Sequence, residues 1–219
     1  MTGMDDIRVV DDVAKAALEL FLDARPKTVL LTGGDTPRRL YELLAKADYD
    51  WSEVEFFFSD ERCVPESDER SNLRMAEEAL LSKVPARVYP MDGANCEGAG
   101  YERALRDRFA DRPWFDLALY GMGPDGHTAS LYPGRPEVEF TEPWVVNVPE
   151  AQWEPYVPRI TLTVPVLSAA TLGLLLIDGE GKRGAFSRFV RGDDIPSRLM
   201  KPERLIVLVD PAAAGTVAG

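Results

Sequence analysis

The 219-residue chain has only one histidine, His127, and only two cysteines, Cys63 and Cys96. Two isolated cysteines form neither a disulfide framework nor a CxxC metal pattern, and this usage suits a reducing cytoplasm. A single histidine without a cluster of other ligands makes a protein-built zinc site unexpected. Cys63 follows Arg62, but no histidine or second cysteine lies near it in the sequence, so a thiol nucleophile is not expected either.

Positive charge is also scarce. The chain has 25 lysines and arginines but 37 aspartates and glutamates, which gives a formal net charge of −12. Such a surface repels nucleic acid and anionic membranes, so neither is expected as a partner. A phosphate-bearing substrate would need a local cationic pocket to overcome this field. The sequence does not fix the oligomeric state, and we expect a monomer or a weak homodimer.

Long hydrophobic runs are missing as well. Stretches such as residues 172–177 are far too short to span a bilayer. The N-terminus, residues 1–6, is acidic and lacks the apolar core of a secretory signal. Together with the cysteine usage, these absences predict a cytoplasmic protein.

The patterns that are present predict an α/β fold in one domain, residues 1–219. Continuously apolar runs alternate with segments of helical periodicity, which indicates a mostly parallel sheet with helices on both faces. Strands are predicted at residues 28–31, 54–58, 88–90, 115–120, 160–163, 172–177 and 205–209. Helices are predicted at residues 9–21, from Pro37 past Leu44, and at 72–81, 98–109, 166–169 and 181–191. The proline-rich stretch 133–158 is the best candidate for a mobile flap.

The histidine follows the predicted strand 115–120 within a glycine-rich run, residues 121–131. A buried strand that ends in such a turn is where α/β proteins place chemistry. An imidazole suits proton transfer near neutral pH, and Asp125 lies two residues before His127. The alternative is a loop histidine satisfied by hydrogen bonds, but the flanking glycines and Asp125 favour a catalytic role.

A second glycine-rich turn, residues 33–37, connects the strand 28–31 to the next helix. Glycine lets the backbone approach a ligand closely, and a helix N-terminus offers free N–H groups to an anion. Thr36 adds a hydroxyl and is a plausible N-cap, with Pro37 in the first turn of the helix. The segment is neither a dinucleotide fingerprint nor a P-loop, and its alternative interpretation is a tight turn with a cap.

Charged residues also stand at the ends of other predicted elements. Asp60 and Arg62 follow the strand 54–58, and Arg159 opens the strand 160–163, while Lys182 lies at a turn between a strand and a helix. Arginine suits planar recognition of phosphate or carboxylate. Each of these residues alone is as well explained by a solvated charge or a surface ion pair, so the case depends on their shared position at element ends.

Taken together, these segments resemble the 6-phosphogluconolactonase family. The matching blocks run in order through residues 32–37, 59–65 with 71–72, 121–134, 159–163 and 181–182. The most specific block, residues 121–134, reads Gly-Met-Gly-Pro-Asp-Gly-His-Thr-Ala-Ser-Leu-Tyr-Pro-Gly. The resemblance implies a three-layer α/β/α Rossmann-like fold, shared with the glucosamine-6-phosphate deaminases. It also implies hydrolysis of 6-phospho-D-glucono-1,5-lactone to 6-phosphogluconate in the pentose phosphate pathway, without metal or cofactor.

The resemblance further implies roles for individual residues. His127 is the expected general base, which takes a proton from the attacking water and returns it to the ring oxygen that leaves. Asp125 and Asp60 would orient the imidazole or the substrate hydroxyls. The residues expected to line the sugar-phosphate site are Gly33, Gly34 and Thr36. The cations expected to neutralise the phosphate or the developing oxyanion, in an order left open, are Arg62, Arg159 and Lys182.

Two other functions remain as alternatives. The related deaminases share several blocks, but their pattern has a tyrosine where this chain has Arg62. Their pattern also has a glutamate five residues after the histidine, where this chain has Tyr132. A non-catalytic phosphosugar-binding module on the same fold would not need Asp125 and His127. The chain departs from the lactonase pattern only at Tyr132, where phenylalanine is common, and in its short tail after Val209.

Overall fold

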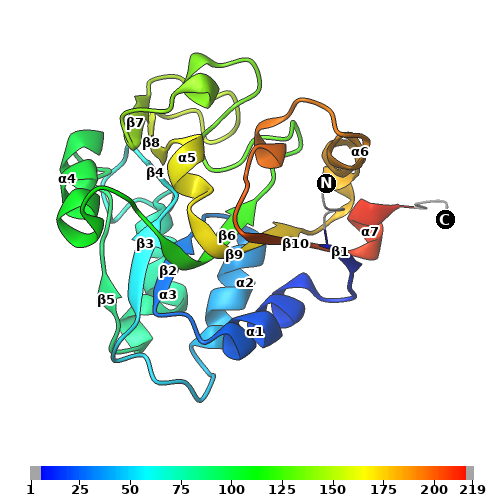
Figure 1. Ribbon diagram of the computed structural model, residues 1–219, viewed down its shortest axis with the longest axis horizontal. Helices are drawn as coiled ribbons and strands as arrows, with labels where there is room; N and C mark the ends of the chain where they lie inside the picture. Colours follow the sequence, from blue (N-terminus) through cyan, green and yellow to red (C-terminus); the bar gives the residue numbers. More distant parts are fainter. Residues whose placement is uncertain (1–5, 216–219) are drawn as a thin grey trace.

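The computed structural model describes residues 6–215 (Figure 1). The acidic residues 1–5, on which the expectation of no secretory signal depended, and the end of the short tail, residues 216–219, lie outside the described residues. No helix within residues 6–215 is long and apolar enough to cross a membrane.

A seven-stranded sheet forms the centre of the molecule, and every neighbouring pair of its strands is parallel. The central strands of this sheet are mostly apolar because both of their faces are covered, whereas the two edge strands also contain charged and exposed residues. In spatial order they are β1 (Asp6–Val9), β10 (Arg204–Val209), β9 (Ala170–Ile177), β6 (Phe115–Gly121), β2 (Thr28–Leu31), β3 (Glu55–Phe58) and β5 (Arg87–Val88). The predicted α/β class and mostly parallel sheet are thus confirmed.

The order of the strands reverses direction between β2 and β6. From β2 the chain proceeds outward to β3 and β5, whereas from β6 it proceeds the other way to β9 and β10. In open α/β sheets, ligands bind beyond the carboxyl ends of the strands at such a switch point. The loops that follow β2 and β6 are the two glycine-rich turns of the sequence, so the topology brings them side by side.

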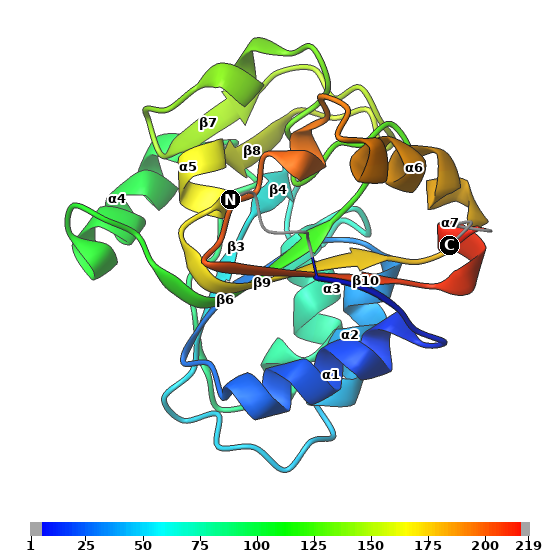
Figure 2. The same cartoon turned by 45° about the vertical axis from the view of Figure 1, so that its right-hand side comes forward.

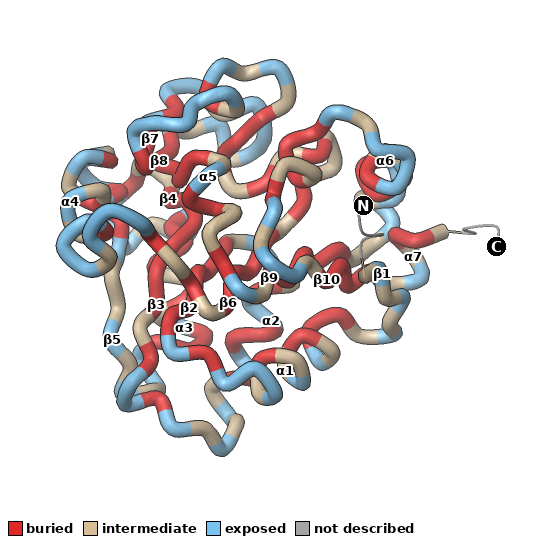
Figure 3. Tube along the Cα trace, viewed as in Figure 1, coloured by how far each residue is buried: buried red, intermediate tan, exposed pale blue. Residues whose placement is uncertain are grey.

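Helices lie on both sides of this sheet (Figure 2). One face is covered by α1 (Val13–Ala24), α2 (Asp35–Leu44) and α3 (Asn72–Ala79). The other side carries α4 (Gly98–Phe109), α5 (Val164–Leu167) and α6 (Arg183–Arg191), with α7 (Pro211–Ala214) beside α6. Short 3-10 turns, labelled η, occupy Leu81–Lys83, Pro136–Glu139, Glu180–Lys182 and Pro196–Arg198. The buried residues follow the strands and the inner faces of these helices (Figure 3).

A second, smaller sheet was not foreseen from the sequence. It is antiparallel, with the order β4 (Asp60–Arg62), β8 (Arg159–Leu162) and β7 (Val145–Val148). Only Ser59 separates β3 from β4. Its N–H donates to Leu31 in the large sheet, and its carbonyl accepts from the N–H of Leu162 in the small one.

Most predicted strands and helices are present within a few residues, and the helix over 98–109 is confirmed as α4. The helix predicted from residue 9 is wrong at its start, because Val9 belongs to β1 and the helix begins at Val13. Residues 6–9 are extended because they pair with β10 at the edge of the sheet, a contact that local periodicity does not show. The predicted cap at Thr36 is also wrong: α2 begins at Asp35, and its N-cap is Gly34, whose φ of +115° suits glycine.

The expectation about the cysteines is wrong. Cys63 and Cys96 form a disulfide whose Cα atoms lie 4.9 Å apart. It joins the end of β4 to the turn before α4, two segments that the sequence separates by 33 positions. Because both sulfurs are bonded, neither is a thiol, in agreement with the prediction that Cys63 is no nucleophile.

Candidate active site

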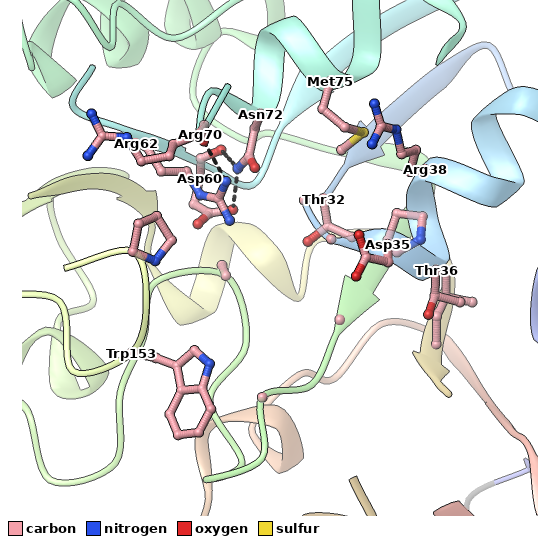
Figure 4. A pocket seen from close by; sticks show the side chains of 18 of the residues that line it. Thr32, Asp35, Thr36, Arg38, Asp60, Arg62, Arg70, Asn72, Met75 and Trp153 are labelled. Atoms are coloured by element: carbon pink, nitrogen blue, oxygen red, sulfur yellow. Dashed lines mark hydrogen bonds between the residues drawn. The ribbon is translucent and has the colours of Figure 1, made fainter. Parts of the chain in front are cut away.

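A pocket of about 890 Å³ opens at the switch point between β2 and β6 (Figure 4). We call the loops after β2 and β6, residues 32–37 and 121–129, the parallel-sheet wall. The residues that face them, 60–62 and 153–155 with 69–75 at the start of α3, are called the antiparallel wall. Figure 4 shows Thr32, Asp35 and Thr36 on one side, and Asp60, Arg62 and Asn72 on the other, with Trp153 below them.

The first loop of the parallel-sheet wall contains the predicted residues Gly33, Gly34 and Thr36, and all three line the pocket. A Cβ atom at Gly33 would lie 2.1 Å from Oδ1 of Asn72, so glycine is needed there to admit this amide from the antiparallel wall. No side chain caps α2. Its first backbone N–H groups therefore remain available to an anion in the pocket.

The second loop holds His127 and Asp125 as a hydrogen-bonded pair. Nδ1 of the imidazole lies 2.6 Å from Oδ1 of Asp125, which also accepts the backbone N–H of His127 at 3.0 Å. Burial alone would raise the pKa of Asp125, but the hydrogen bonds and charge of His127 outweigh it and hold the pKa below its ordinary value. The pair leaves Nε2 as the ring nitrogen available for chemistry.

The surroundings of His127 fix the position of its ring. A Cβ atom at Gly123 would lie 2.0 Å from Nδ1 of the imidazole, so the ring packs against a bare glycine backbone. The ring of Tyr132 lies 5.0 Å from it, centroid to centroid. Nη1 of Arg188, from α6, donates to the carbonyl of Asp125 at 2.9 Å. The loop is thus held from three sides, as a residue in proton transfer requires.

Asp60 lies at the centre of a buried network on the antiparallel wall. Oδ2 accepts a hydrogen bond from Ser130 Oγ at 2.7 Å, and Oδ1 accepts from Ser59 Oγ at 3.2 Å and from Asn72 Nδ2 at 3.3 Å. Its partner Asn72 has a buried Oδ1 without a hydrogen-bond partner among the described residues. Asp60 itself lines the pocket, so the structure brings this predicted residue to the site.

Glu61, the next residue, binds backbone groups of the protein and does not line the pocket. Its carboxylate accepts the backbone N–H groups of Arg62, Asn72 and Leu73, at 2.6, 2.7 and 2.8 Å, and the hydroxyl of Ser71. Burial raises the pKa of Glu61, although the three backbone donors oppose this shift. A carboxylate at the first turn of α3 satisfies N–H groups that the helix leaves unpaired, and it fixes the segment that carries Asn72.

Five cations line the pocket: Arg38, Arg62, Arg70, Arg74 and Lys182. Three of these are neutralised, because Arg38 and Arg74 pair with Glu78 and Arg70 pairs with Asp68. Within residues 6–215, the charged groups of Arg62 and Lys182 form no salt bridge, and Nε of Arg62 is buried without a hydrogen-bond partner. Burial lowers the pKa of Lys182 against the opposing charges of Asp125 and Asp35. Nη1 of Arg62 donates to the carbonyl of Arg70 at 2.5 Å, a neutral partner, so Arg62 and Lys182 are the two predicted cations of the pocket whose charge no carboxylate balances in the described part of the chain.

Arg159 takes a different position from the one predicted. It is buried, with 3% of its surface exposed, and it is not among the residues that line the pocket. Nη2 donates to the carbonyls of Pro155, at 2.6 Å, and Trp153, at 3.5 Å, while Nε donates to that of Val157 at 3.1 Å. The structure therefore places Arg159 behind the pocket, against the segment 153–157.

The sequence interpretation missed the pocket residues contributed by the segment 153–155. Trp153, Glu154 and Pro155 lie in the proline-rich stretch expected to form a flap, and they line the antiparallel wall. Elsewhere this stretch forms a 3-10 turn and the strand β7; its mobility stays a prediction. A tryptophan in a polar, proline-rich stretch was the signal that could have identified the segment, because an isolated aromatic outside any periodic element has no core to join.

No group of three or more histidine, cysteine or carboxylate side chains within residues 6–215 is arranged to hold a metal ion. The chemistry that the pocket offers is acid–base chemistry at an imidazole beside two available cations.

Comparison with known proteins places this arrangement in a family. The family model of glucosamine-6-phosphate isomerases/6-phosphogluconolactonase matches residues 7–209. A 6-phosphogluconolactonase of Thermotoga maritima is 35% identical over 201 residues, which cover 85% of this chain and 86% of that protein. A crystal structure of 6-phosphogluconolactonase from Thermotoga maritima superposes with a TM-score of 0.86 at 29% identity, covering 94% of this chain and 100% of that one.

A probable chloroplastic 6-phosphogluconolactonase 4 of Oryza sativa subsp. indica is also 35% identical, over 217 residues that cover 90% of this chain. The match spans only 66% of the rice protein's length. The similarity thus extends over nearly the whole of this chain, although the rice relative is longer.

Proposed function

This chain belongs to the glucosamine-6-phosphate isomerase/6-phosphogluconolactonase family, and on that premise we propose that it hydrolyses 6-phospho-D-glucono-1,5-lactone to 6-phosphogluconate in the pentose phosphate pathway. One observation carries the proposal. The imidazole of His127 is bound through Nδ1 to Asp125, and it lies in a pocket with two available cations, Arg62 and Lys182. A base and a cationic environment are what hydrolysis of a phosphorylated lactone requires.

His127 acts as the general base in this mechanism. Asp125 accepts a hydrogen bond from Nδ1–H, which keeps the proton on Nδ1 and leaves the lone pair on Nε2. Nε2 takes a proton from a water molecule as the water oxygen bonds to the lactone carbonyl carbon. The intermediate collapses with cleavage of the bond to the ring oxygen, which receives the proton from the imidazolium and becomes a hydroxyl. The new carboxylic acid releases its own proton to solvent.

The phosphate is assigned to the N-terminus of α2 and to Lys182. This assignment is supported by the lining of the pocket, to which Lys182 and the first residues of α2, Asp35 and Thr36, all contribute. Gly33, Gly34 and Thr36 line the same part of the pocket. Arg62 and Asp60 lie on the opposite wall, where they would meet the lactone end of the sugar, its hydroxyls and the developing oxyanion.

The family model covers both lactonases and amino-sugar isomerases, so the second activity needs its own argument. Tyr132, whose ring packs beside His127, stands where the deaminases carry a glutamate that assists their histidine. A phenol cannot supply a carboxylate at that position. Arg62 likewise stands where the deaminase pattern has tyrosine. Both residues favour lactone hydrolysis over ring opening of an amino sugar.

The test is a coupled assay. Glucose-6-phosphate dehydrogenase generates the phosphorylated lactone in place, and 6-phosphogluconate is followed with its own dehydrogenase. Acceleration above the spontaneous rate by the wild-type protein, and not by His127→Ala, is expected. Folded wild-type protein that gives no acceleration would contradict the proposal; glucosamine 6-phosphate, with ammonia as the readout, would then separate a deaminase from a module that only binds.

We further propose that residues 1–219 act as one domain, as a monomer or a weak homodimer without nucleic acid, and that the protein works in the cytoplasm. The single continuous core from Val13 to Ala214 supports the first point. The disulfide between Cys63 and Cys96 is the observation that opposes a reducing compartment. Thiol labelling of the protein in rapidly quenched cells decides the question, since two labelled cysteines indicate the reduced, cytoplasmic form.

A further inference from the structure

We propose that Trp153 is a specificity-determining residue that packs its indole against the C–H face of the bound sugar, and that Arg159 is the positioning residue that holds it there. This inference rests on the proposed function, because it concerns the sugar in the same pocket. We call residues 153–157, of which the first three line the pocket, the strap.

Trp153 differs from the other tryptophans of the chain. Trp51 and Trp144 are buried, at 6% and 5% exposure, and Nε1 of Trp114 donates to Thr171 Oγ1 at 3.0 Å. The side chain of Trp153 is 42% exposed, and within residues 6–215 its indole forms no hydrogen bond and no ring contact. An indole left open to solvent in a pocket wall has both its face and its N–H available to a ligand.

The composition of the pocket gives that ligand its chemistry. Hydroxyl, carboxylate, guanidinium and ammonium groups line most of the pocket, and Trp153 is its only aromatic residue besides the imidazole of His127, counted over the described part of the chain. A six-membered sugar presents polar hydroxyls around its edge and apolar C–H groups on its faces. The polar walls of the pocket can bind the hydroxyls around the sugar ring, and the indole of Trp153 can pack against the C–H groups on one face of the ring. The pocket is therefore complementary to such a molecule.

Hydrogen bonds from the protein interior hold the backbone of the strap, in contrast to a loop that moves freely. Arg159 directs hydrogen bonds at three strap carbonyls, those of Trp153, Pro155 and Val157. The N–H of Cys63 also donates to the carbonyl of Pro158 at 2.8 Å, next to the end of the strap. Because the buried arginine directs these donors to one short segment, it fixes the conformation of the segment before the ligand binds. Less conformational entropy is then lost on binding.

The strand register explains why Arg159 serves the strap while Arg62 serves the pocket. The two arginines lie directly opposite each other in the antiparallel pair β4 and β8. Like charges in this position repel, so the two guanidinium groups are best placed when they point to different partners. Arg159 has the strap carbonyls as partners, and Arg62 lines the pocket.

The experiment combines kinetics with a binding probe that needs no turnover. Trp153→Ala is expected to raise KM for the phosphorylated lactone about tenfold while kcat changes by less than about threefold, and Trp153→Phe is expected to restore most of the affinity. Tyr156→Ala is the matched control. Tyr156 lies on the same strap and is 70% exposed, but it does not line the pocket. KM for Trp153→Ala within twofold of the wild-type value, or an equal rise in Tyr156→Ala, overturns the proposal.

Glucose 6-phosphate, which keeps the six-membered ring and the phosphate but has no lactone to hydrolyse, tests the contact directly. It is expected to change the tryptophan fluorescence of the wild-type protein and not that of Trp153→Phe, whereas inorganic phosphate leaves the emission unchanged. Wild-type protein that hydrolyses the lactone but shows no fluorescence change contradicts the role of Trp153 alone. Protein that shows the change without hydrolysis contradicts the proposed function and keeps the contact.

The role of Arg159 is tested by a double-mutant cycle. Arg159→Gln is expected to raise KM about fivefold to tenfold, and the double variant Trp153→Ala/Arg159→Gln is expected to match Trp153→Ala within about twofold, because both changes remove the same contact. Additive losses would overturn the positioning role. If Arg159→Gln does not fold, the exposed Trp153 still permits the test of the contact.

Discussion

The two walls of the pocket are built in different ways. Each loop of the parallel-sheet wall is a short turn after a buried strand, and the groups that matter are neighbours in sequence: Asp125 binds His127 two residues later. The antiparallel wall depends on distant partners, since the hydroxyl that holds Asp60 comes from Ser130, 70 positions away. The proton-transfer residues are therefore specified by local sequence, whereas the shape of the opposite wall is set by tertiary contacts.

The largest expected effect comes from removing the proposed general base from the parallel-sheet wall. His127→Ala should lower kcat for the phosphorylated lactone about 10²–10⁴-fold, the usual contribution of a positioned general base, while the fold is retained. Initial rates, corrected for spontaneous hydrolysis, provide the measurement. Tyr132→Phe is the matched control beside the same ring, and it should lose little activity. Unchanged turnover in His127→Ala would remove the imidazole from the mechanism.

The next effect concerns the antiparallel wall and appears in stability. Replacing both Cys63 and Cys96 by serine should lower the free energy of unfolding by about 3–4 kcal/mol, because the disulfide closes a long loop in the unfolded chain. Urea unfolding under oxidising conditions measures it. A reducing agent should destabilise the wild-type protein by a similar amount and leave the double variant unchanged. Wild-type protein that is insensitive to the reducing agent would show that the bond contributes no stability in solution.

A smaller effect separates phosphate binding at Lys182, which lines the pocket from the turn after β9, from the chemistry of the parallel-sheet wall. Lys182→Ala should raise KM for the phosphorylated lactone about 10–100-fold, the value of a hydrogen bond to a charged group. Unphosphorylated glucono-1,5-lactone should be hydrolysed equally well by the variant and the wild type. Lys201→Ala, an exposed lysine outside the pocket, is the control. Equal losses with both lactones would place the phosphate elsewhere.

The smallest effect is a dependence on pH. Burial lowers the pKa of Lys182 below its ordinary value of 10.5. Its ammonium group therefore loses its proton at a lower pH than that of an exposed lysine. Calorimetric titration with 6-phosphogluconate should show affinity falling by up to about tenfold as the pH rises through this lowered pKa, since one charged contact is lost. Lys182→Arg, which keeps its charge, should bind with nearly constant affinity; an identical decline in that variant would assign the titration to another group.

The difference between the walls also explains what the sequence could predict. The strands β2 and β6 and the turns after them follow from apolar runs that end in glycine, and the two turns meet because parallel strands end at one edge of a sheet. His127 and Asp125 could be chosen on these grounds, and Lys182 by the same argument applied to the turn after β9. The helix start at Gly34 was misjudged because a glycine cap uses no side chain, and only the backbone conformation reveals it.

The antiparallel wall could not be derived in this way. Of its strands, only β8 is indicated by a local pattern, the predicted strand 160–163. The strands β4 and β7 are three and four residues long, and the antiparallel pairing of all three depends on contacts between distant segments. The same holds for β1, because the helical periodicity that begins at Val9 does not show the pairing of this residue with β10. The orientation of Arg159 depends on its position opposite Arg62 in the small sheet, and the disulfide depends on the approach of two segments 33 positions apart, so neither is visible in the local sequence.

Ser59 connects the two sheets that carry the walls of the pocket. Its N–H is bonded into the large sheet and its carbonyl into the small one, so a single residue belongs to both hydrogen-bond ladders. Separation of one wall from the other displaces Ser59 itself and so disrupts both bonds. In hydrogen-exchange terms, the amide protons of Ser59 and Leu162 should therefore become exposed in the same opening event, with the same dependence on denaturant. The pocket would then lose both walls together as one cooperative unit, instead of opening like a hinge.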